Sequence, residues 1–134
     1  MAGAKDGFHT ITPRLVLKDA SAAIELYKRV FGAVEFARIL VPGSDKVFHA
    51  VIGIGDSKIF LVDQAATDRP PAPAGSAGGL FYLYVDNVDA QHKKATVAGM
   101  KEIAPPADMP WGDRMSVVSD KYGQEWSLAA PIAR

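Results

Sequence analysis

Apolar and polar residues follow a pattern in this chain that occurs twice. In the first half, a strand-like run over residues 8–18 precedes residues 20–31, where apolar side chains recur every three or four positions, as in an amphipathic helix. Asp19 and Gly32 flank the helical run as a typical N-cap and C-cap. Short β-favouring runs separated by turn sequences then predict three strands, over residues 34–41, 47–54 and 58–62.

The same order of elements returns after residue 79. The pattern predicts a strand over residues 80–85, a helix over 88–98 and a strand over 101–104. Residues 105–110 are rich in proline and predict a loop. The chain then ends in a predicted β-hairpin, whose turn sequence DKYGQ carries a glycine where a positive φ is favourable; its two strands cover residues 114–119 and 125–130.

A constant offset relates the two halves. The helix caps Asp19 and Asn87 are 68 positions apart, and so are the turn glycines Gly55 and Gly123. Apart from a one-residue slip after the helices, this offset needs no gap. Repetition of this kind constrains the fold strongly. It predicts an α+β fold of duplicated βαβββ modules, forming a curled mixed sheet around a cleft.

The predicted domain organisation follows from the repeat. The first module covers residues 1–67 and the second covers residues 80–134. Residues 68–79, rich in proline, alanine and glycine, form a linker between them. We expect the two modules to make up one structural domain, since 134 residues suit one domain or two fused half-domains.

Composition narrows the functional classes. The formal net charge is zero and the pI is about 6.8, so the chain lacks the basic surface expected of a nucleic-acid-binding or membrane-surface protein. It contains no cysteine, which excludes disulfides and thiolate chemistry. We find no signal peptide and no membrane-spanning run, and we expect a cytoplasmic protein.

Three segments resemble a known family: ITPRLVLKDASAAIELYKRVFGA, HAVIGIGDSKIFLVD and WGDRMSVVSDKYGQEWSLA. In this order they are similar to the vicinal oxygen chelate superfamily, which includes glyoxalase I, bleomycin-resistance proteins and extradiol dioxygenases. The PhnB-like branch is the most similar. The resemblance implies the glyoxalase/bleomycin-resistance fold and a homodimer. It leaves the chemistry open, because this fold carries many activities.

The resemblance also implies where metal-dependent members hold their ion. The four positions correspond here to Thr12, Ile59, Leu80 and Ser127. None is a histidine or a carboxylate, the side chains that a divalent metal prefers. We therefore predict no metal and no other cofactor. A divalent-metal-dependent lyase, isomerase or dioxygenase is the alternative, and whether the protein is an enzyme stays open.

The three histidines have different interpretations. His49 is a weak catalytic candidate: it is either a hydrogen-bonded histidine of the sheet or a ligand-contacting residue, acting as acid or base with Asp63 or Glu125. A metal pair of His9 with His49 would need both strands to face one cleft. His92 is expected to be a solvated surface residue.

A metal-free site would depend on aromatic surface and a few polar groups. Trp111 either stacks on a flat ligand or plugs the end of the sheet. Arg114 either binds an anion or pairs with Asp113, Asp120 or Glu102. Core packing is expected for Trp126. The sequence thus predicts a small-molecule-binding protein that sequesters a flat aromatic ligand or drug, through Trp111, Arg114, His49, Phe48, Phe60, Thr12 and Ser127.

Overall fold

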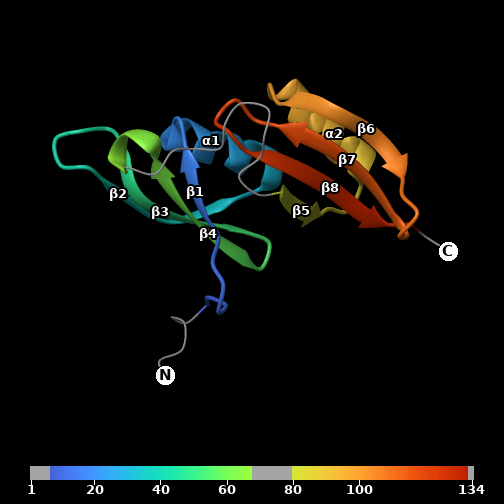
Figure 1. Cartoon of the computed structure of the whole chain (residues 1–134), viewed down its shortest axis with the longest axis horizontal. Helices are drawn as coiled ribbons and strands as arrows, with labels where there is room; N and C mark the ends of the chain where they lie inside the picture. Colours follow the sequence, from blue (N-terminus) through green and yellow to red (C-terminus); the bar gives the residue numbers. More distant parts are fainter. Residues whose placement is uncertain (1–6, 68–79, 133–134) are drawn as a thin grey trace. The chain divides into compact units, whose positions relative to one another are not determined.

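The computed structural model describes residues 7–67 and 80–132 (Figure 1). The chain divides into two compact units, Met1–Pro71 and Ala72–Arg134. Their boundary falls within the predicted linker, residues 68–79, which lies outside the described residues. Each unit contains one helix and one four-stranded sheet, and each is described by itself below. In the described ranges, neither helix is long and apolar enough to cross a membrane.

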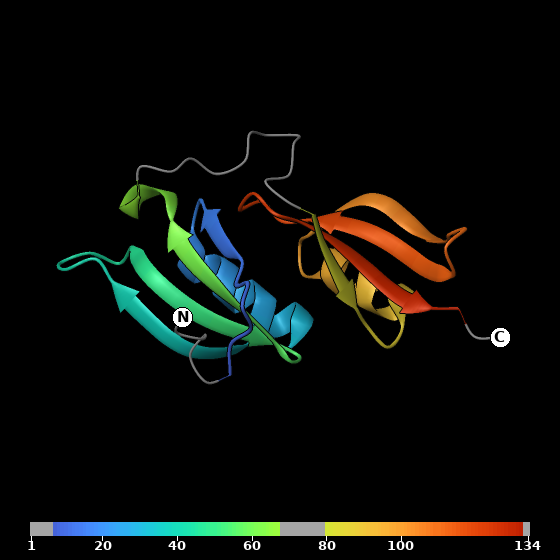
Figure 2. The ribbon, with the colours of Figure 1, turned by 60° about the horizontal axis from the view of Figure 1, so that its bottom comes forward.

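The first unit forms a mixed sheet with one helix across it. Its strand order is β1-β4-β3-β2, with β1 parallel to β4 and the other pairs antiparallel. The helix packs on β1, β3 and β4, and Figure 2 shows it lying along one face of the sheet. The elements are β1 (Arg14–Leu17), α1 (Ala20–Phe31), β2 (Val34–Leu40), β3 (Val47–Ile54), β4 (Ser57–Asp63) and a 3₁₀ turn, η1 (Gln64–Ala66).

The second unit repeats this topology. Its strand order is β5-β8-β7-β6, again with one parallel pair, β5 with β8, and a helix packed on the sheet (Figure 2). The elements are β5 (Leu80–Tyr84), α2 (Val88–Val97), β6 (Lys101–Asp108), β7 (Asp113–Ser119) and β8 (Glu125–Pro131). The predicted α+β fold with two βαβββ modules is confirmed.

Both helix caps also form as predicted. The Asp19 carboxylate accepts a hydrogen bond from the Ala22 amide, and the Asn87 side chain accepts one from the Ala90 amide. At the other end of α1, Gly32 adopts the left-handed conformation with φ of 67°. A side-chain oxygen at the N-cap satisfies amides that have no partner within the helix.

Two predicted boundaries are wrong. The first strand begins at Arg14 rather than at residue 8, and of residues 8–13 Pro13 accepts a backbone hydrogen bond of 2.9 Å from the Phe60 amide of β4. β6 runs on to Asp108, through Pro105 and Pro106, which the sequence assigned to a loop. Prolines fit there because β6 is an edge strand, and the pairing of β6 with β7 shifts register on both sides of Ala104.

The constant offset of 68 positions between the two halves does not hold for the pairing of the strands or for the length of the turns. Arg14 pairs with Phe60, but Tyr82, the offset equivalent of Arg14, pairs with Ser127 rather than with Leu128. The turn joining β3 to β4 has two residues, 55–56, whereas the turn joining β7 to β8 has five, 120–124. Topology repeats between the units, while strand register and turn length do not.

Alternation along the strands separates the two faces of the first sheet. One set of apolar side chains faces α1 and is buried: Leu15, Leu17, Ala50, Ile52, Ile59 and Leu61. The intervening residues point to the other face, which no helix covers within the part of this unit that the structure describes. We call this surface the open face of the first unit.

A buried carboxylate joins the helix to the sheet in the first unit. Asp63, only 2% exposed, ends β4. Its Oδ1 accepts a hydrogen bond from the Ala20 amide at 2.9 Å, and its Oδ2 accepts one from the Val47 amide at 2.6 Å. One side chain thereby fixes the start of α1, the start of β3 and the end of β4. Such pairing offsets the cost of burying a charge.

An ion-pair network joins α1 to β2 on the helix side of the sheet. Glu35 binds both Lys28 and Arg38 at 2.8 Å, and Glu25 binds the same two cations. Hydrogen bonds from Arg38 and Lys28 lower the pKa of Glu35 to about 2. Glu35 and Arg38 therefore belong to the structural support of β2 and not to the open face.

We predict that Asp63→Asn lowers the free energy of unfolding by about 2 kcal/mol, because the asparagine NH₂ group would face a backbone amide that needs an acceptor. The measurement is urea denaturation followed by circular dichroism. Asp45→Asn, in an exposed turn of the same unit, is the matched control and should change stability by less than about 0.5 kcal/mol. Equal effects of the two substitutions would contradict the role of Asp63.

Candidate functional site

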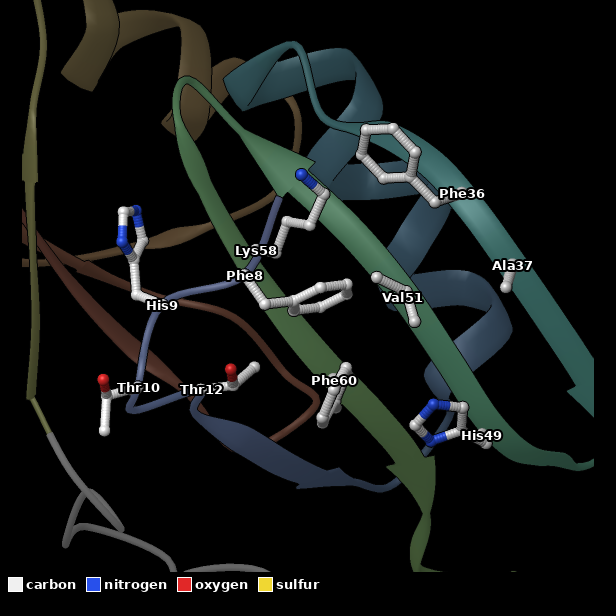
Figure 3. Close-up of a pocket in the computed structure, with 10 residues that line it drawn as sticks. All are labelled: Phe8, His9, Thr10, Thr12, Phe36, Ala37, His49, Val51, Lys58 and Phe60. Carbon is white, nitrogen blue, oxygen red and sulfur yellow. The ribbon is translucent and has the colours of Figure 1, made fainter. Parts of the chain in front are cut away.

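The open face of the first unit carries a pocket of about 800 Å³ (Figure 3). Its walls come from β2, β3 and β4 and from the segment that precedes β1. The lining is mostly aromatic and apolar, with one ammonium group, two imidazoles and two hydroxyls: Phe8, His9, Thr10, Thr12, Phe36, Ala37, His49, Val51, Lys58 and Phe60. None of these described residues is an aspartate or a glutamate.

Phe60 lies in the middle of this aromatic surface. It sits on β4 opposite Val51 of β3, and alternation turns both side chains to the open face. The ring centroid of Phe60 lies 5.6 Å from that of Phe8 and 4.8 Å from that of His49. Both contacts are tilted, an arrangement favoured by aromatic rings. Phe60 and His49, both candidate ligand-binding residues from the sequence, therefore line the same pocket.

A glycine makes room for a second wall of the pocket. A Cβ at Gly53 would lie 2.7 Å from the Phe36 ring, a distance that real Cβ atoms do not tolerate. Phe36 itself stands at a register shift of β2, between Glu35 and Ala37, so that its ring folds over β3. Gly53, in a strand interior, is the sequence signal of this close approach.

Lys58 holds its ammonium group between two of these rings. The Nζ lies 4.8 Å from the centroid of Phe36 and 5.4 Å from that of Phe8. It also donates a hydrogen bond of 3.0 Å to the carbonyl of Gly7. Among the described residues it forms no ion pair. Cation–π contacts of this kind hold an ammonium in place without neutralising it.

His9 and His49 do not form a metal pair. Both line the pocket, but Figure 3 shows them on opposite sides of it, with Phe8 and Phe60 between. Across residues 7–67 and 80–132, no three histidine or carboxylate side chains gather as a metal site would require.

The four positions implied by the resemblance do not fit a metal either. Ile59 is buried against α1, because its neighbours Lys58 and Phe60 take the open face. Thr12 lines the pocket but offers only a hydroxyl, and Ser127 belongs to the second unit. Leu80 has a hydrocarbon side chain. This donor set lacks the nitrogen and carboxylate ligands of a divalent site.

Of the two carboxylates expected to assist His49, Asp63 is not placed to do so. Asp63 is buried and already accepts two backbone amides on the helix side. Glu125 lies on β8, in the second unit. Phe48 precedes His49 on β3 but is 55% exposed and does not line the pocket. The sequence placed it in the site because it could not show which side of β3 the pocket uses.

The second unit carries a different polar–aromatic cluster. The Asp113 carboxylate is buried and accepts a hydrogen bond of 2.7 Å from the Tyr82 hydroxyl; the Tyr84 hydroxyl lies 3.5 Å from the same oxygen. Burial, together with the neighbouring Asp113, raises the pKa of Tyr82. Trp111 donates its indole N–H to the Tyr82 hydroxyl at 3.1 Å and is 61% exposed.

Two other predicted residues are held by structural contacts. The Arg114 guanidinium binds both carboxylate oxygens of Asp89, at 2.7 and 2.9 Å, and also Asp108. It makes the expected ion pair, but with partners that the sequence did not suggest. Trp126 is 2% exposed and donates to Asp120, so its predicted core role is confirmed.

The expectation that His92 is solvated is wrong. It is 6% exposed, and its ring nitrogens lie 2.8 Å from the Ser116 hydroxyl and 2.7 Å from the Glu102 carboxylate. These contacts connect α2 to β7 and β6. The lysines beside His92 on α2 suggested a solvent-facing position, but the helix turns His92 toward the sheet.

A model of the Glyoxalase/Bleomycin resistance protein/Dioxygenase superfamily matches residues 7–128. The chain belongs to this superfamily, and the resemblance to the vicinal oxygen chelate proteins inferred from the sequence is confirmed.

Relatives extend over most of the chain. An uncharacterised protein of Mycobacterium bovis is 36% identical over 128 residues, which cover 91% of this chain and 83% of that protein. Two solved structures share the fold. A gene product of Arabidopsis thaliana has a TM-score of 0.75 at 23% identity, over 92% of this chain and 99% of that one. A PhnB protein of Bacillus cereus has a TM-score of 0.69 at 15% identity, over 93% and 100%.

We predict that Trp111→Ala lowers the free energy of unfolding by less than about 1 kcal/mol, because the indole is mostly exposed and loses a single hydrogen bond. Circular dichroism follows the unfolding of both variants in denaturant, because each variant keeps a different tryptophan. The comparison variant, Trp126→Ala, should cost about 3–5 kcal/mol. A comparable loss from Trp111→Ala would make Trp111 a structural plug.

Proposed function

We propose that the protein binds a flat small molecule in the pocket on the open face of the first unit, without a metal. The observation that carries this proposal is the aromatic wall of Phe60, flanked by Phe8 and His49 and bordered by Phe36. Small-molecule sites are mostly apolar, with a few polar groups that orient the ligand. This pocket has that composition, and its volume of about 800 Å³ suits a ligand of drug size.

The metal-free form of the proposal is supported by the donor chemistry. A metal acting as a Lewis acid needs a set of nitrogen or carboxylate ligands. In the first unit, the implied positions Thr12 and Ile59 offer one hydroxyl and one buried alkyl group. Membership of the superfamily does not decide between binding and catalysis, since its fold carries both. Sequestration of a flat aromatic compound is the activity that these residues support best.

We predict that Phe60→Ala weakens the binding of a planar aromatic ligand at least tenfold, because the ligand loses the central ring on which it would stack. The ligand is first selected from naphthalene, quinoline and acridine compounds by saturation-transfer NMR, and its affinity is then measured by calorimetry.

Phe48→Ala is the matched control, since it removes an exposed phenylalanine of the same unit that does not line the pocket. Its affinity should stay within about twofold of the wild type. If Phe48→Ala and Phe60→Ala weaken binding equally, the ligand occupies a different surface. If no planar compound binds the folded wild-type protein, the proposed function is wrong.

We also propose that two copies of the chain associate through β2. This edge strand carries four exposed apolar side chains without a proline, namely Val34, Phe36, Ile39 and Leu40. The corresponding edge strand β6 instead contains two prolines and three charged residues. Prolines and charges are common means of preventing an edge from pairing, and β2 lacks the prolines and keeps its charges on the helix side.

Ile39→Lys should therefore shift the protein from dimer to monomer, because it places a charge within the apolar edge. The measurement is light scattering coupled to size-exclusion chromatography, over a range of protein concentrations. Val97→Lys, at a residue of α2 that is 79% exposed, is the control and should leave the mass unchanged. An unaltered dimer in Ile39→Lys would place the interface elsewhere.

A further inference from the structure

We infer that the ligand of this pocket is an aromatic anion, whose negative group binds the ammonium of Lys58. The inference rests on the proposed function and specifies its ligand class: a flat, largely apolar body carrying one carboxylate or comparable acid. Four observations support it, namely the charge of the lining, the unused hydrogen-bonding capacity of Lys58, the way its side chain is held, and the position of Thr12 and His49.

The described residues that line the pocket include a positively charged side chain and no carboxylate. Lys58 is the one lysine or arginine among the ten described residues that line the pocket, and none of these ten is an aspartate or a glutamate. Elsewhere in the described part of this unit, Glu25 and Glu35 are engaged with cations on the helix side of the sheet. Asp63 is buried there as well. A bound anion would thus meet a positive charge without an opposing carboxylate in the lining.

The ammonium group of Lys58 can donate more hydrogen bonds than the described residues accept. An ammonium group donates three hydrogen bonds. The described residues accept one of them, at the Gly7 carbonyl. The rings of Phe8 and Phe36 interact with the charge but accept no strong hydrogen bond. A carboxylate would supply the acceptor and the counter-charge together, and charge-assisted hydrogen bonds are about twice as strong as neutral ones.

The side chain is also held in place before a ligand arrives. The rings of Phe8 and Phe36 contact the ammonium from separate segments, and Lys58 pairs with Gly53, which has no side chain to obstruct it. A free lysine loses rotamer entropy when it binds an anion. That cost is reduced here, because the fold has already restricted the side chain.

The neighbouring polar groups suit the same ligand. Thr12 and His49 line the pocket around Phe60, and each has a group able to donate a hydrogen bond. A flat ring stacked on Phe60 would therefore lie between the ammonium of Lys58 and these neutral polar groups. A cationic ligand would be repelled by Lys58. A neutral ligand would desolvate the ammonium without giving it a counter-charge.

The test compares three ligands with the same ring and different charge: naphthoate, naphthamide and naphthylmethylammonium. Calorimetry measures their affinities for the wild type, Lys58→Met, Lys58→Arg and the control Lys46→Met, which changes an exposed lysine in a turn of the same unit. Methionine keeps an unbranched side chain of similar length but removes the charge. Melting temperatures establish that all the variants are folded.

We expect the wild type and Lys46→Met to prefer naphthoate over naphthamide by about tenfold, and to bind naphthylmethylammonium most weakly. In Lys58→Met the preference for naphthoate should disappear while naphthamide binds within about twofold of the wild type. Lys58→Arg should keep most of the preference, and added salt should reduce it.

Two results overturn the inference while the proposed function survives: naphthoate and naphthamide bind the wild type equally well, or Lys58→Met weakens both ligands by the same factor. In the second case Lys58 contributes packing rather than charge recognition. If none of the three ligands binds the folded wild type, the inference fails; the proposed function fails with it only when the wider panel of planar compounds is also negative.

Discussion

A four-stranded sheet has two faces, and the single helix of each unit packs on only one of them. In the first unit this constraint sends Leu61 and Ile52 toward α1 and turns Phe60 and Val51 to the open face. Asp63 strengthens the division, because its carboxylate joins the helix to the buried side of the sheet. Side chains on the open face can therefore line a pocket without disturbing the packing between the sheet and the helix.

The two open faces have diverged although the topology around them is the same. The first carries phenylalanines, Lys58, imidazoles and hydroxyls, whereas in the second unit the Tyr82 hydroxyl donates to the buried Asp113 carboxylate and accepts from the indole of Trp111. Strand order is the same in both units, and each sheet buries apolar side chains against its helix. The exposed positions between them are released from packing, so each unit presents its own chemistry.

The sequence predicted what local signals specify: both helix caps and the final hairpin. It failed where distant segments meet. His92 looked solvated, because a sequence does not show that Ser116 and Glu102 lie across from its helix. Phe8, Phe36 and Lys58 were missed as a group for the same reason, since residues from three segments meet only in the folded unit. Gly53 was the available local clue, as a glycine inside a strand marks a close approach.

If the proposed function holds, Lys58 suits the pocket to oxygen-bearing ligands without metal-binding side chains. The resemblance places a metal-ligand position at Ile59, but the register turns Ile59 to the core and its neighbour Lys58 to the open face. In metal-dependent members a bound cation attracts the ligand's oxygens. Here an ammonium held between two phenylalanine rings supplies positive charge beside that position. A lysine charge attracts an anion but polarises a carbonyl far less than a divalent ion, which favours binding over catalysis in this pocket.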